Sequence, residues 1–419
     1  MHDFKYIGNR FYCESLNVES VARKVGTPFY LYSHKTLLDH FRKIQRAFKD
    51  IDPLICFSMK ANSSLALVRA LVNAGAGLDI VSGGELFKAL KVGCPGNRIV
   101  YASVGKTEEE ILEAIKKGIL FFNVESLPEL DLINEASHRL NKVTQVAIRI
   151  NPDVEPGTHQ YITTGKLTNK FGMDFLTARK IFEQRSRFGN LNINGIHMHI
   201  GSQIIDGAPF LDAIRRVIRF IDNLRFLGIR LEYLNIGGGL GIIYKDEKPQ
   251  TADQFAQAVL PLLKKTGLKI ILEPGRFIVG NAGILVTKVL YIKKSVEKTF
   301  VIVDAGMNDL IRPSLYQAYH EILPLNKYSS RPIKAVDVVG PICESGDFFA
   351  KNRKMCLPNE GDLLAIMSAG AYGFSMSSNY NSRKRTCEIL AKGSKFAVIR
   401  KRQSYQDLVE GETIPNFIK

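Results

Sequence analysis

The sequence predicts an α/β protein, a (β/α)8 barrel of the TIM type joined to a mostly β domain. Short apolar, β-branched runs alternate strictly with stretches of helical spacing, as in right-handed βα units. Eight such runs follow one another, which is the strand number of a TIM barrel. Several runs stop at reactive residues, and TIM barrels gather their chemistry at the carboxyl rim. Strand count alone leaves an open doubly wound sheet as the structural alternative.

The expected barrel strands are four to eight residues long and are separated by helical segments. In chain order they are Leu54–Ser58, Leu78–Val81, Arg98–Ala102, Leu120–Val124, Gln145–Ile150, Ile193–Ile200, Tyr233–Ile236 and Leu268–Leu272. Helical spacing is clearest at Ser64–Ala74, Glu85–Val92, Thr107–Lys117 and Pro209–Leu227. Thr107 with Glu110 three residues on is the pattern of a capping box at a helix start. We assign residues 31–276 to the barrel.

The pattern changes after Arg276, because the apolar runs that follow have no helices between them. These runs are Ile284–Lys293, Thr299–Asp304, Ile333–Val339, Asp362–Met367, Thr386–Leu390 and Phe396–Arg400. Residues 1–30 also read as strand pieces around one short helix, Asn17–Val25. We therefore expect residues 1–30 and 277–419 to form one separate β domain.

Composition narrows the class of protein. Of the 419 residues 45% are apolar and 23% are charged, as in ordinary soluble globular proteins. No apolar stretch approaches the roughly 20 residues of a membrane helix, and Met1–Lys5 lacks a secretory pattern. The six cysteines are scattered without a CxxC pair, which favours reduced thiols in the cytoplasm. The net charge of +16 is spread along the chain without a nucleic-acid motif, so we expect neither a nucleic-acid nor a membrane partner.

A lysine and two glycine loops lie where a barrel would bind a phosphorylated ligand. Lys60 comes two residues after the first expected strand, so its amine faces the barrel mouth. Gly237–Gly239 follow the seventh strand and Gly275-Arg276 follow the eighth, the two loops with which TIM barrels often bind phosphate. Glycine lets the backbone amides approach an anion closely. The plain structural explanations are a surface lysine for Lys60 and a pair of tight turns for the two glycine loops.

Four further residues have reactive side chains in suggestive places. Glu273 ends the eighth strand beside the expected phosphate site, where a carboxylate can pair with a ring nitrogen. His197 and His199 share one face of the sixth strand, so they can bind zinc, pack in the core or stack on a flat ligand. Cys343 lies in the β domain, and an unperturbed thiol with a pKa of about 8.5 can serve as a proton donor if its site tunes it.

Taken together, these motifs resemble the diaminopimelate decarboxylases, a family in the alanine-racemase-like, fold-type III group of enzymes that use pyridoxal 5'-phosphate (PLP). The resemblance covers nearly the whole chain. Its motifs, in order, are Phe57–Asn62, Gly77–Glu85, His197–Gln203, Gly237–Gly239, Glu273–Arg276, Asp304–Asp309, Arg312–Tyr316, Cys343–Ser345 and Gly370–Tyr372. Phe57-Ser58-Met59 stands where Tyr-Ala-Val is more usual, which is a conservative departure.

The resemblance implies a role for each matched residue around PLP. Lys60 is the catalytic lysine that holds PLP as a Schiff base, His199 stacks on the ring, and Glu273 pairs with the pyridine nitrogen. The remaining implied PLP contacts are Asp79, Ser202, Gly237, Gly238, Gly239, Pro274, Gly275, Arg276 and Tyr372.

The same resemblance implies a substrate side that is shared between two subunits. Arg276, Arg312 and Tyr316 bind the substrate carboxylate that is retained, with Tyr372 also at the substrate. Glu344 takes the ammonium at that distal end, and Cys343 is the catalytic proton donor. In this family the last two residues reach the site of the partner subunit. The implied enzyme is therefore a homodimer whose β domain contributes to the substrate site and the dimer interface.

The implied reaction is decarboxylation of meso-2,6-diaminopimelate to L-lysine and CO2, the last step of lysine biosynthesis. Loss of CO2 leaves a carbanion, which needs an electron sink. A PLP ring whose nitrogen is kept protonated by an acid at position 273 is a stronger sink than a PLP ring whose nitrogen faces an arginine, as in alanine racemase.

Three alternatives compete. An ornithine, arginine or carboxynorspermidine decarboxylase of the same group is one, but ornithine decarboxylases carry aspartate where Glu344 stands. A metal-dependent barrel hydrolase would need ligands beyond His197 and His199, for which only Asp79 is a candidate. A PLP-binding homeostasis protein would be a single barrel without the β domain.

Overall fold

The chain divides into two structural units, each built around its own sheet. The computed structural model describes residues 2–155, 170–328 and 330–418. One unit runs from Leu37 to Val279, and the other joins Met1–Thr36 to Gly280–Lys419. The division passes through helix α2 (His34–Ala47) and follows helix α10 (Arg276–Val279). The boundaries expected from the sequence fall inside strand β4 (Phe29–Ser33) and at the start of α10.

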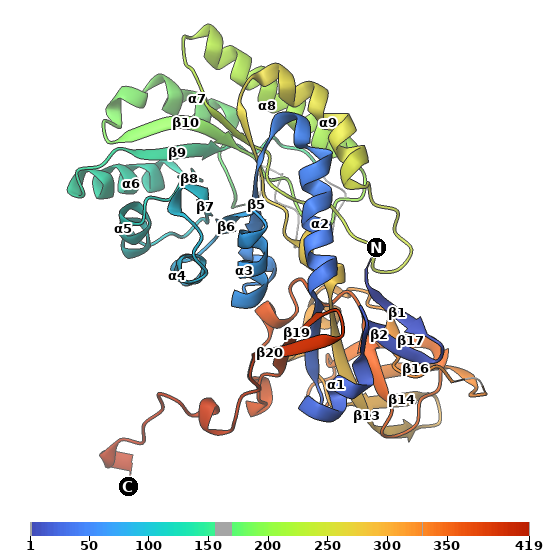
Figure 1. Ribbon diagram of the computed structural model, residues 1–419. Coiled ribbons are helices and arrows are strands. Elements are labelled where there is room, and N and C mark those ends of the chain that lie inside the picture. The colour runs from blue at the N-terminus through green and yellow to red at the C-terminus, as the bar shows by residue number, and fades with distance from the viewer. Residues whose placement is uncertain (1, 156–169, 329, 419) are drawn as a thin grey trace. The chain divides into compact units, whose positions relative to one another are not determined.

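Within the described residues, the first unit holds a closed barrel of eight parallel strands (Figure 1). The strands pair in chain order and the last returns to the first, so the barrel is confirmed and an open doubly wound sheet is excluded. The strands are β5 (Leu54–Ser58), β6 (Gly77–Ile80), β7 (Ile99–Ala102), β8 (Phe121–Val124), β9 (Thr144–Arg149), β10 (Leu191–His197), β11 (Tyr233–Asn235) and β12 (Lys269–Leu272). Only β10 departs clearly from expectation, because it ends at His197.

The barrel interior is filled by side chains, which explains the apolar runs of the sequence. Both faces of each strand are covered, so strands such as β7 and β8 are buried at every position. One interior cluster joins five of the strands through Cys56, Val100, Phe121, Ala147 and Ile271, each at most 1% exposed. A packed interior of this kind leaves the carboxyl rim as the place for polar chemistry.

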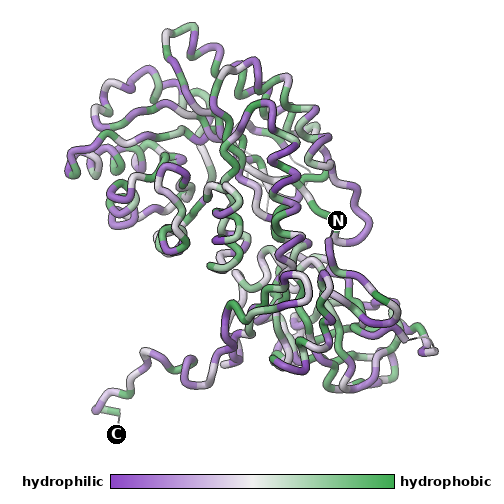
Figure 2. Tube along the Cα trace, in the orientation of Figure 1, coloured by the Kyte–Doolittle hydropathy of each residue, from purple (hydrophilic) through white to green (hydrophobic). Residues whose placement is uncertain are grey.

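Helices follow the strands and cover the outside of the barrel (Figure 1). They are α3 (Leu65–Asn73), α4 (Gly83–Lys91), α5 (Glu108–Lys116), α6 (Leu127–Arg139), α7 (Phe175–Glu183), α8 (Ala208–Phe226) and α9 (Ala252–Thr266). Their sequences alternate between hydrophilic and hydrophobic residues, so each turns one face to the strands (Figure 2). The capping box expected at Thr107 is present, with its side chain accepting from the Glu110 N–H.

In the part of the chain that the structure describes, we find no helix that combines the length and the apolar character needed to cross a membrane.

The second unit is a β domain that takes in the N-terminal segment, as predicted. Its main sheet runs β17-β16-β14-β13-β4-β19-β20, and β18 joins β13 to β15. Strand β4 lies between β13 and β19, so the N-terminal segment is part of the sheet itself. The other strands are β13 (Gly283–Lys294), β14 (Thr299–Val303), β15 (Ile322–Pro324), β16 (Ile333–Val339), β17 (Phe348–Cys356), β18 (Leu363–Ile366), β19 (Cys387–Lys392) and β20 (Lys395–Arg400).

Smaller elements complete this unit. Strands β1 (Phe4–Ile7), β2 (Arg10–Cys13) and β3 (Leu16–Asn17) form a three-stranded sheet, followed by helix α1 (Val18–Val25). A short helix, α11 (Arg312–Tyr316), corrects the expectation that no helix separates these strands. Pro313 sits in its first turn, a position where the missing backbone N–H of proline costs nothing.

Candidate active site

A lysine and an aspartate meet at the carboxyl rim of the barrel. Lys60 lies in a 3-10 turn that follows β5 directly, and its Nζ is 3.3 Å from Asp79 Oδ2 on β6. The Ser58 hydroxyl donates to the same aspartate oxygen. The other oxygen, Oδ1, is buried and has no hydrogen-bond partner among the described residues. The side chain of Lys60 remains 34% exposed, so the amine is open to a ligand from the rim.

Glu273 receives hydrogen bonds from three different strands. Its Oε1 accepts from Asn235 Nδ2 at 2.5 Å and from Asn123 Nδ2 at 3.1 Å, and its Oε2 is 3.2 Å from His197 Nε2. Asn235 and His197 end β11 and β10, and Asn123 is the next-to-last residue of β8, so all three donors come from the carboxyl ends of barrel strands. The amide nitrogens of both asparagines can only donate, so Glu273 Oε1 is the acceptor in both hydrogen bonds.

The two buried acids of this site have opposite tendencies to hold a proton. Burial raises the pKa of Asp79, and the neighbouring charge of Glu273 raises it further. Burial would also raise the pKa of Glu273, but His197, Lys60 and the Asn235 amide outweigh it and hold that pKa well below its usual range. Two close carboxyl groups in a low dielectric rarely ionise together. The arrangement therefore favours charge on Glu273.

His199 lies beyond the end of its strand, which corrects the expectation that both histidines share a strand face. Strand β10 ends at His197, because its pairing with β9 and β11 stops there. His199 Nδ1 accepts from the Gly238 N–H at 3.2 Å. Burial, followed by the charge of Lys60, lowers the pKa of His199 well below its ordinary value. The imidazole is therefore neutral at physiological pH, as suits a ring that stacks on a flat ligand.

The glycine loop after β11 is packed so closely that a side chain would not fit. A Cβ on Gly237 would stand 2.6 Å from the Met198 carbonyl oxygen, and one on Gly238 would collide with the Glu273 carbonyl. Gly237 and Gly238 already donate their N–H groups to Asn235 Oδ1 and His199 Nδ1. The loop thus ties the seventh strand end to both Glu273 and His199, and its role toward a phosphate stays a prediction.

Ser202 and Arg276 are brought together at the same rim. The Arg276 guanidinium donates from Nε and Nη2 to Ser202 Oγ at 3.2 and 3.1 Å, and from Nη1 to the Tyr244 hydroxyl at 2.7 Å. Arg276 is only 6% exposed. Gly275 packs against Ser58 and Ala61, which places the loop after β12 beside the turn that carries Lys60. Pro274 lies between these residues, and its carbonyl accepts from the Ser58 N–H.

The remaining predicted residues lie in the β unit. Arg312 is buried and bonds His320 Nε2 at 2.8 Å, while His320 Nδ1 contacts the Met367 carbonyl. Tyr316 ends α11, and Tyr372 has a left-handed φ of 55°, a strained conformation of the kind that clusters at functional sites.

Cys343 and Glu344 form an exposed loop of the β unit. The Cys343 N–H donates to Asn381 Oδ1 at 2.8 Å. Glu344 hydrogen-bonds the Tyr380 side chain and thereby raises the pKa of that phenol. Asn381 has a φ of 54°, so a strained backbone holds this loop as well. The roles of these residues at a substrate stay predictions.

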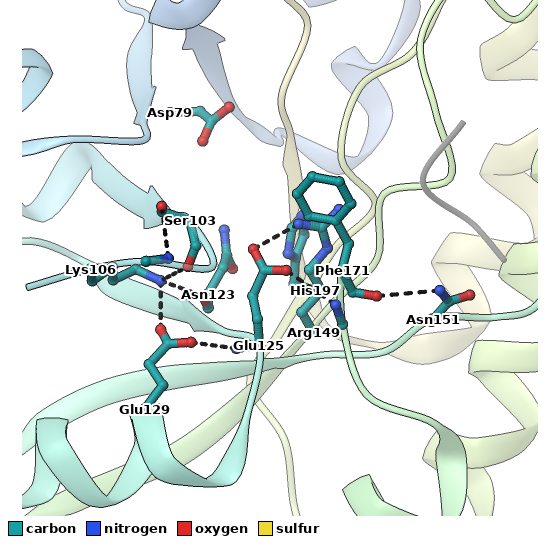
Figure 3. A network of polar contacts seen from close by, with 12 residues as sticks. Asp79, Ser103, Lys106, Asn123, Glu125, Glu129, Arg149, Asn151, Phe171 and His197 are labelled. Carbon is teal, nitrogen blue, oxygen red and sulfur yellow. Dashed lines mark hydrogen bonds and ion pairs between the residues drawn. The ribbon is translucent and has the colours of Figure 1, made fainter. Parts of the chain in front are cut away.

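Sequence reasoning missed the residues that support Glu273 from behind. Asn123 is the next-to-last residue of β8 and Asn235 is the last residue of β11, and a polar residue in each of these short apolar runs is the signal that could have found them. Next to them, Arg149 forms a buried ion pair with Glu125 at 2.8 Å, and Lys106 forms one with Glu129 at 2.6 Å (Figure 3). In the described ranges we find no group of three His, Cys, Asp or Glu arranged for a metal, and His197 instead contacts Glu273.

The site fits a flat, phosphorylated, aldehyde-bearing ligand such as PLP. Lys60 supplies an amine for the aldehyde of such a ligand. The ionised carboxylate of Glu273 can accept a hydrogen bond from its protonated ring nitrogen. Asp79 Oδ1 is buried and has no hydrogen-bond partner among the described residues, so it is free to contact a ligand. The glycine loop after β11 and Ser202 lie at the same strand ends, with room for backbone atoms only at the glycines.

Comparison with known proteins agrees with this geometry. The family model described as "Pyridoxal-dependent decarboxylase, pyridoxal binding domain" matches residues 34–280. Diaminopimelate decarboxylase of Aquifex aeolicus is 49% identical over 97% of this chain and 96% of that protein, and the enzyme of Neisseria meningitidis serogroup A is 45% identical over 96% and 98%.

Solved structures show the same similarity. Diaminopimelate decarboxylase from Helicobacter pylori complexed with L-lysine is 42% identical, with a TM-score of 0.91 over 94% of this chain and 98% of that one. The enzyme of M. jannaschii in complex with L-lysine is 37% identical, with a TM-score of 0.95 over the full length of both chains.

Proposed function

The chain belongs to the pyridoxal-dependent decarboxylases, and we propose that it converts meso-2,6-diaminopimelate to L-lysine and CO2 with PLP as its cofactor. The observation that carries this proposal is the full-length similarity to diaminopimelate decarboxylases, two of which have been solved with L-lysine bound. The barrel rim supports it, because Lys60 and Glu273 supply the two groups that such a cofactor requires at its aldehyde and at its ring nitrogen.

The residues of the barrel unit prepare the site for this chemistry. When bound, PLP supplies an electron sink for the charge that loss of CO2 leaves on carbon. Glu273 is anionic and buried, so it would hold a proton on the ring nitrogen of PLP through a charge-assisted hydrogen bond. Asp79 lies 3.3 Å from Lys60 Nζ and orients the amine. Burial lowers the pKa of His199, so its neutral imidazole would stack on the ring without adding charge to it.

The β unit supplies the specificity in this proposal. The far end of diaminopimelate carries both an ammonium and a carboxylate, so its recognition needs an acid and a base together. Arg276, Arg312 and Tyr316 bind the retained carboxylate, with Tyr372 beside the substrate and the phosphate. Glu344 takes the ammonium.

Cys343 donates the proton that replaces the lost carboxyl group. Both Cys343 and Glu344 are exposed in a single chain, which agrees with their serving the site of a second subunit in a homodimer. The free, scattered cysteines support a cytoplasmic location.

The runner-up is an ornithine, arginine or carboxynorspermidine decarboxylase of the same fold. Substrates of ornithine type end in a cation alone, so the buried guanidinium of Arg312 would face a like charge in their site. A panel assay separates the two proposals. The purified protein, loaded with PLP, is incubated with each amino acid while released CO2 and the product are measured. We expect CO2 and L-lysine from meso-diaminopimelate, and release from ornithine or arginine instead would contradict the proposal.

Glu344→Ala tests the specificity in more detail. We expect this change to weaken turnover of diaminopimelate far more than binding of PLP, because Glu344 faces the distal ammonium and not the cofactor. Turnover is followed by CO2 release, and PLP affinity by titration of the apoprotein. An equal loss in both measurements would count against the proposed role of Glu344.

A further inference from the structure

His197 is a buried residue of this site that has no part in the proposed chemistry so far. Its side chain is 1% exposed, and its Nε2 lies 3.2 Å from Glu273 Oε2. The other ring nitrogen, Nδ1, is buried without a hydrogen-bond partner among the described residues. An imidazole in the core normally satisfies both nitrogens. The contact with Glu273 is therefore what fixes the orientation of this ring.

The direction of that hydrogen bond follows from the surroundings of the carboxylate. Asn235 and Asn123 both donate to Oε1, so Glu273 acts as an acceptor. An ionised carboxylate can only accept, which makes His197 Nε2 the donor. Three donors from three strand ends thus converge on one acid, and only His197 contacts Oε2 among the residues that the structure describes.

The contrast with Asp79 shows what the donors accomplish. Asp79 is equally buried, but its Oδ2 receives only the Ser58 hydroxyl and the Lys60 amine, and its Oδ1 receives nothing among the described residues. The two acids compete for ionisation in one desolvated site. The donors around Glu273 decide that competition in its favour.

We propose that His197 is a positioning residue for the cofactor: its Nε2–H holds the Glu273 carboxylate ionised and oriented so that the pyridine nitrogen of PLP stays protonated. This inference rests on the proposed function, because it concerns the same cofactor. It adds to it a residue that acts through Glu273 and does not itself touch the reacting atoms. The two histidines at this strand end therefore have different roles: His197 contacts Glu273, and His199 faces the ring of the cofactor.

Two amide variants separate the hydrogen bond from packing. In His197→Gln the glutamine side chain would carry its N–H about as far from the backbone as the Nε2 of histidine, whereas the shorter amide of His197→Asn would fall short of Oε2. Both variants bury the same chemical group, so both carry a similar cost of burial. His138→Gln on helix α6 makes the same chemical change at an exposed position and serves as the control.

The test is the 15N chemical shift of the ring nitrogen in holoenzyme that carries 15N-labelled PLP. We expect a protonated nitrogen in the wild type, in His197→Gln and in His138→Gln, and a shift toward the unprotonated value in His197→Asn. Because a hydrogen bond to a charged group is lost, kcat of His197→Asn should fall about 10- to 100-fold. Its thermal unfolding should match that of His197→Gln.

A protonated ring in His197→Asn would overturn the inference, and so would equal loss of protonation in His197→Gln and His197→Asn. Failure of the proposed function is a separate outcome, because it shows in the wild type as absence of CO2 release from diaminopimelate. The nitrogen shift can be read in any holoprotein that binds PLP, whatever its substrate.

Discussion

The buried ion pair behind the candidate site makes a sharp prediction about stability. Lys106 has a fully buried side chain, and its Nζ donates to Glu129 Oε1 at 2.6 Å, to the Ser103 carbonyl at 2.8 Å and to the Asn123 carbonyl at 3.0 Å (Figure 3). An ammonium group has three donors, so all of them are used. Lys106→Met keeps the apolar stem and removes all three interactions at once.

The expected loss can be worked from these contacts. Removing one partner of a buried ion pair costs about 3–5 kcal/mol, because the other charge is left in the core. Glu129 keeps one partner, since its Oε2 still accepts from the Glu125 N–H at 2.9 Å. We therefore expect the lower end of that range, about 3 kcal/mol. The affected Asn123 also contacts Glu273, so the variant should weaken PLP binding as well.

The assay is urea unfolding followed by helical circular dichroism, with a matched exposed pair as the control. Lys117→Met removes a pair with Glu113 at 3.3 Å in which both side chains are about half exposed, and it should cost less than about 0.5 kcal/mol. Burial raises the pKa of Glu129, so the stability linked to its proton is present at low pH and lost as the pH rises. The Lys106→Met variant should therefore regain part of its free energy of unfolding at lower pH. The double variant Lys106→Met/Glu129→Gln should regain it as well. Equal losses in the Lys106 and Lys117 variants would show that burial of the pair is not what gives it its strength.

The other predictions concern the glycine loop and the β unit. Gly238→Ala should cost about 1–3 kcal/mol of stability and weaken PLP binding, because the new Cβ would collide with the Glu273 carbonyl. Gly105→Ala is the control and should change the unfolding midpoint little, because the space around its Cβ is open. Similar unfolding midpoints in the two variants would contradict this prediction. Burial raises the pKa of Asp309 to about 7, so the stability linked to its proton is lost as the pH rises through about 7. Asp309→Asn should remove that slope in thermal melts on either side of this pH, and a persistent slope would show that another group causes it.

The barrel could be predicted from sequence because its strands are covered on both faces and so read as unbroken apolar runs. Strand β17 (Phe348–Cys356) was missed for the opposite reason, since its exposed positions carry lysine and asparagine and interrupt the apolar run. Lys60 and Glu273 could be placed at one rim, because parallel strands end together. Their supporting partners could not. Asn123 is 150 residues from Glu273 in sequence, and only closure of the barrel brings the two side chains to 3.1 Å.

Lys60 and Glu273 serve two ends of one PLP molecule in the function proposed for this chain, and every other role depends on that pairing. Borohydride reduction of the PLP-loaded protein, digestion and peptide mass spectrometry identify the lysine that holds the cofactor. The 15N chemical shift of the ring nitrogen is measured in the wild type and in Glu273→Ala. We expect a pyridoxyl group on Lys60 in both proteins and a ring nitrogen that is protonated only when Glu273 is present. A label on another lysine, or a ring nitrogen whose protonation does not depend on Glu273, would show that the pairing is wrong.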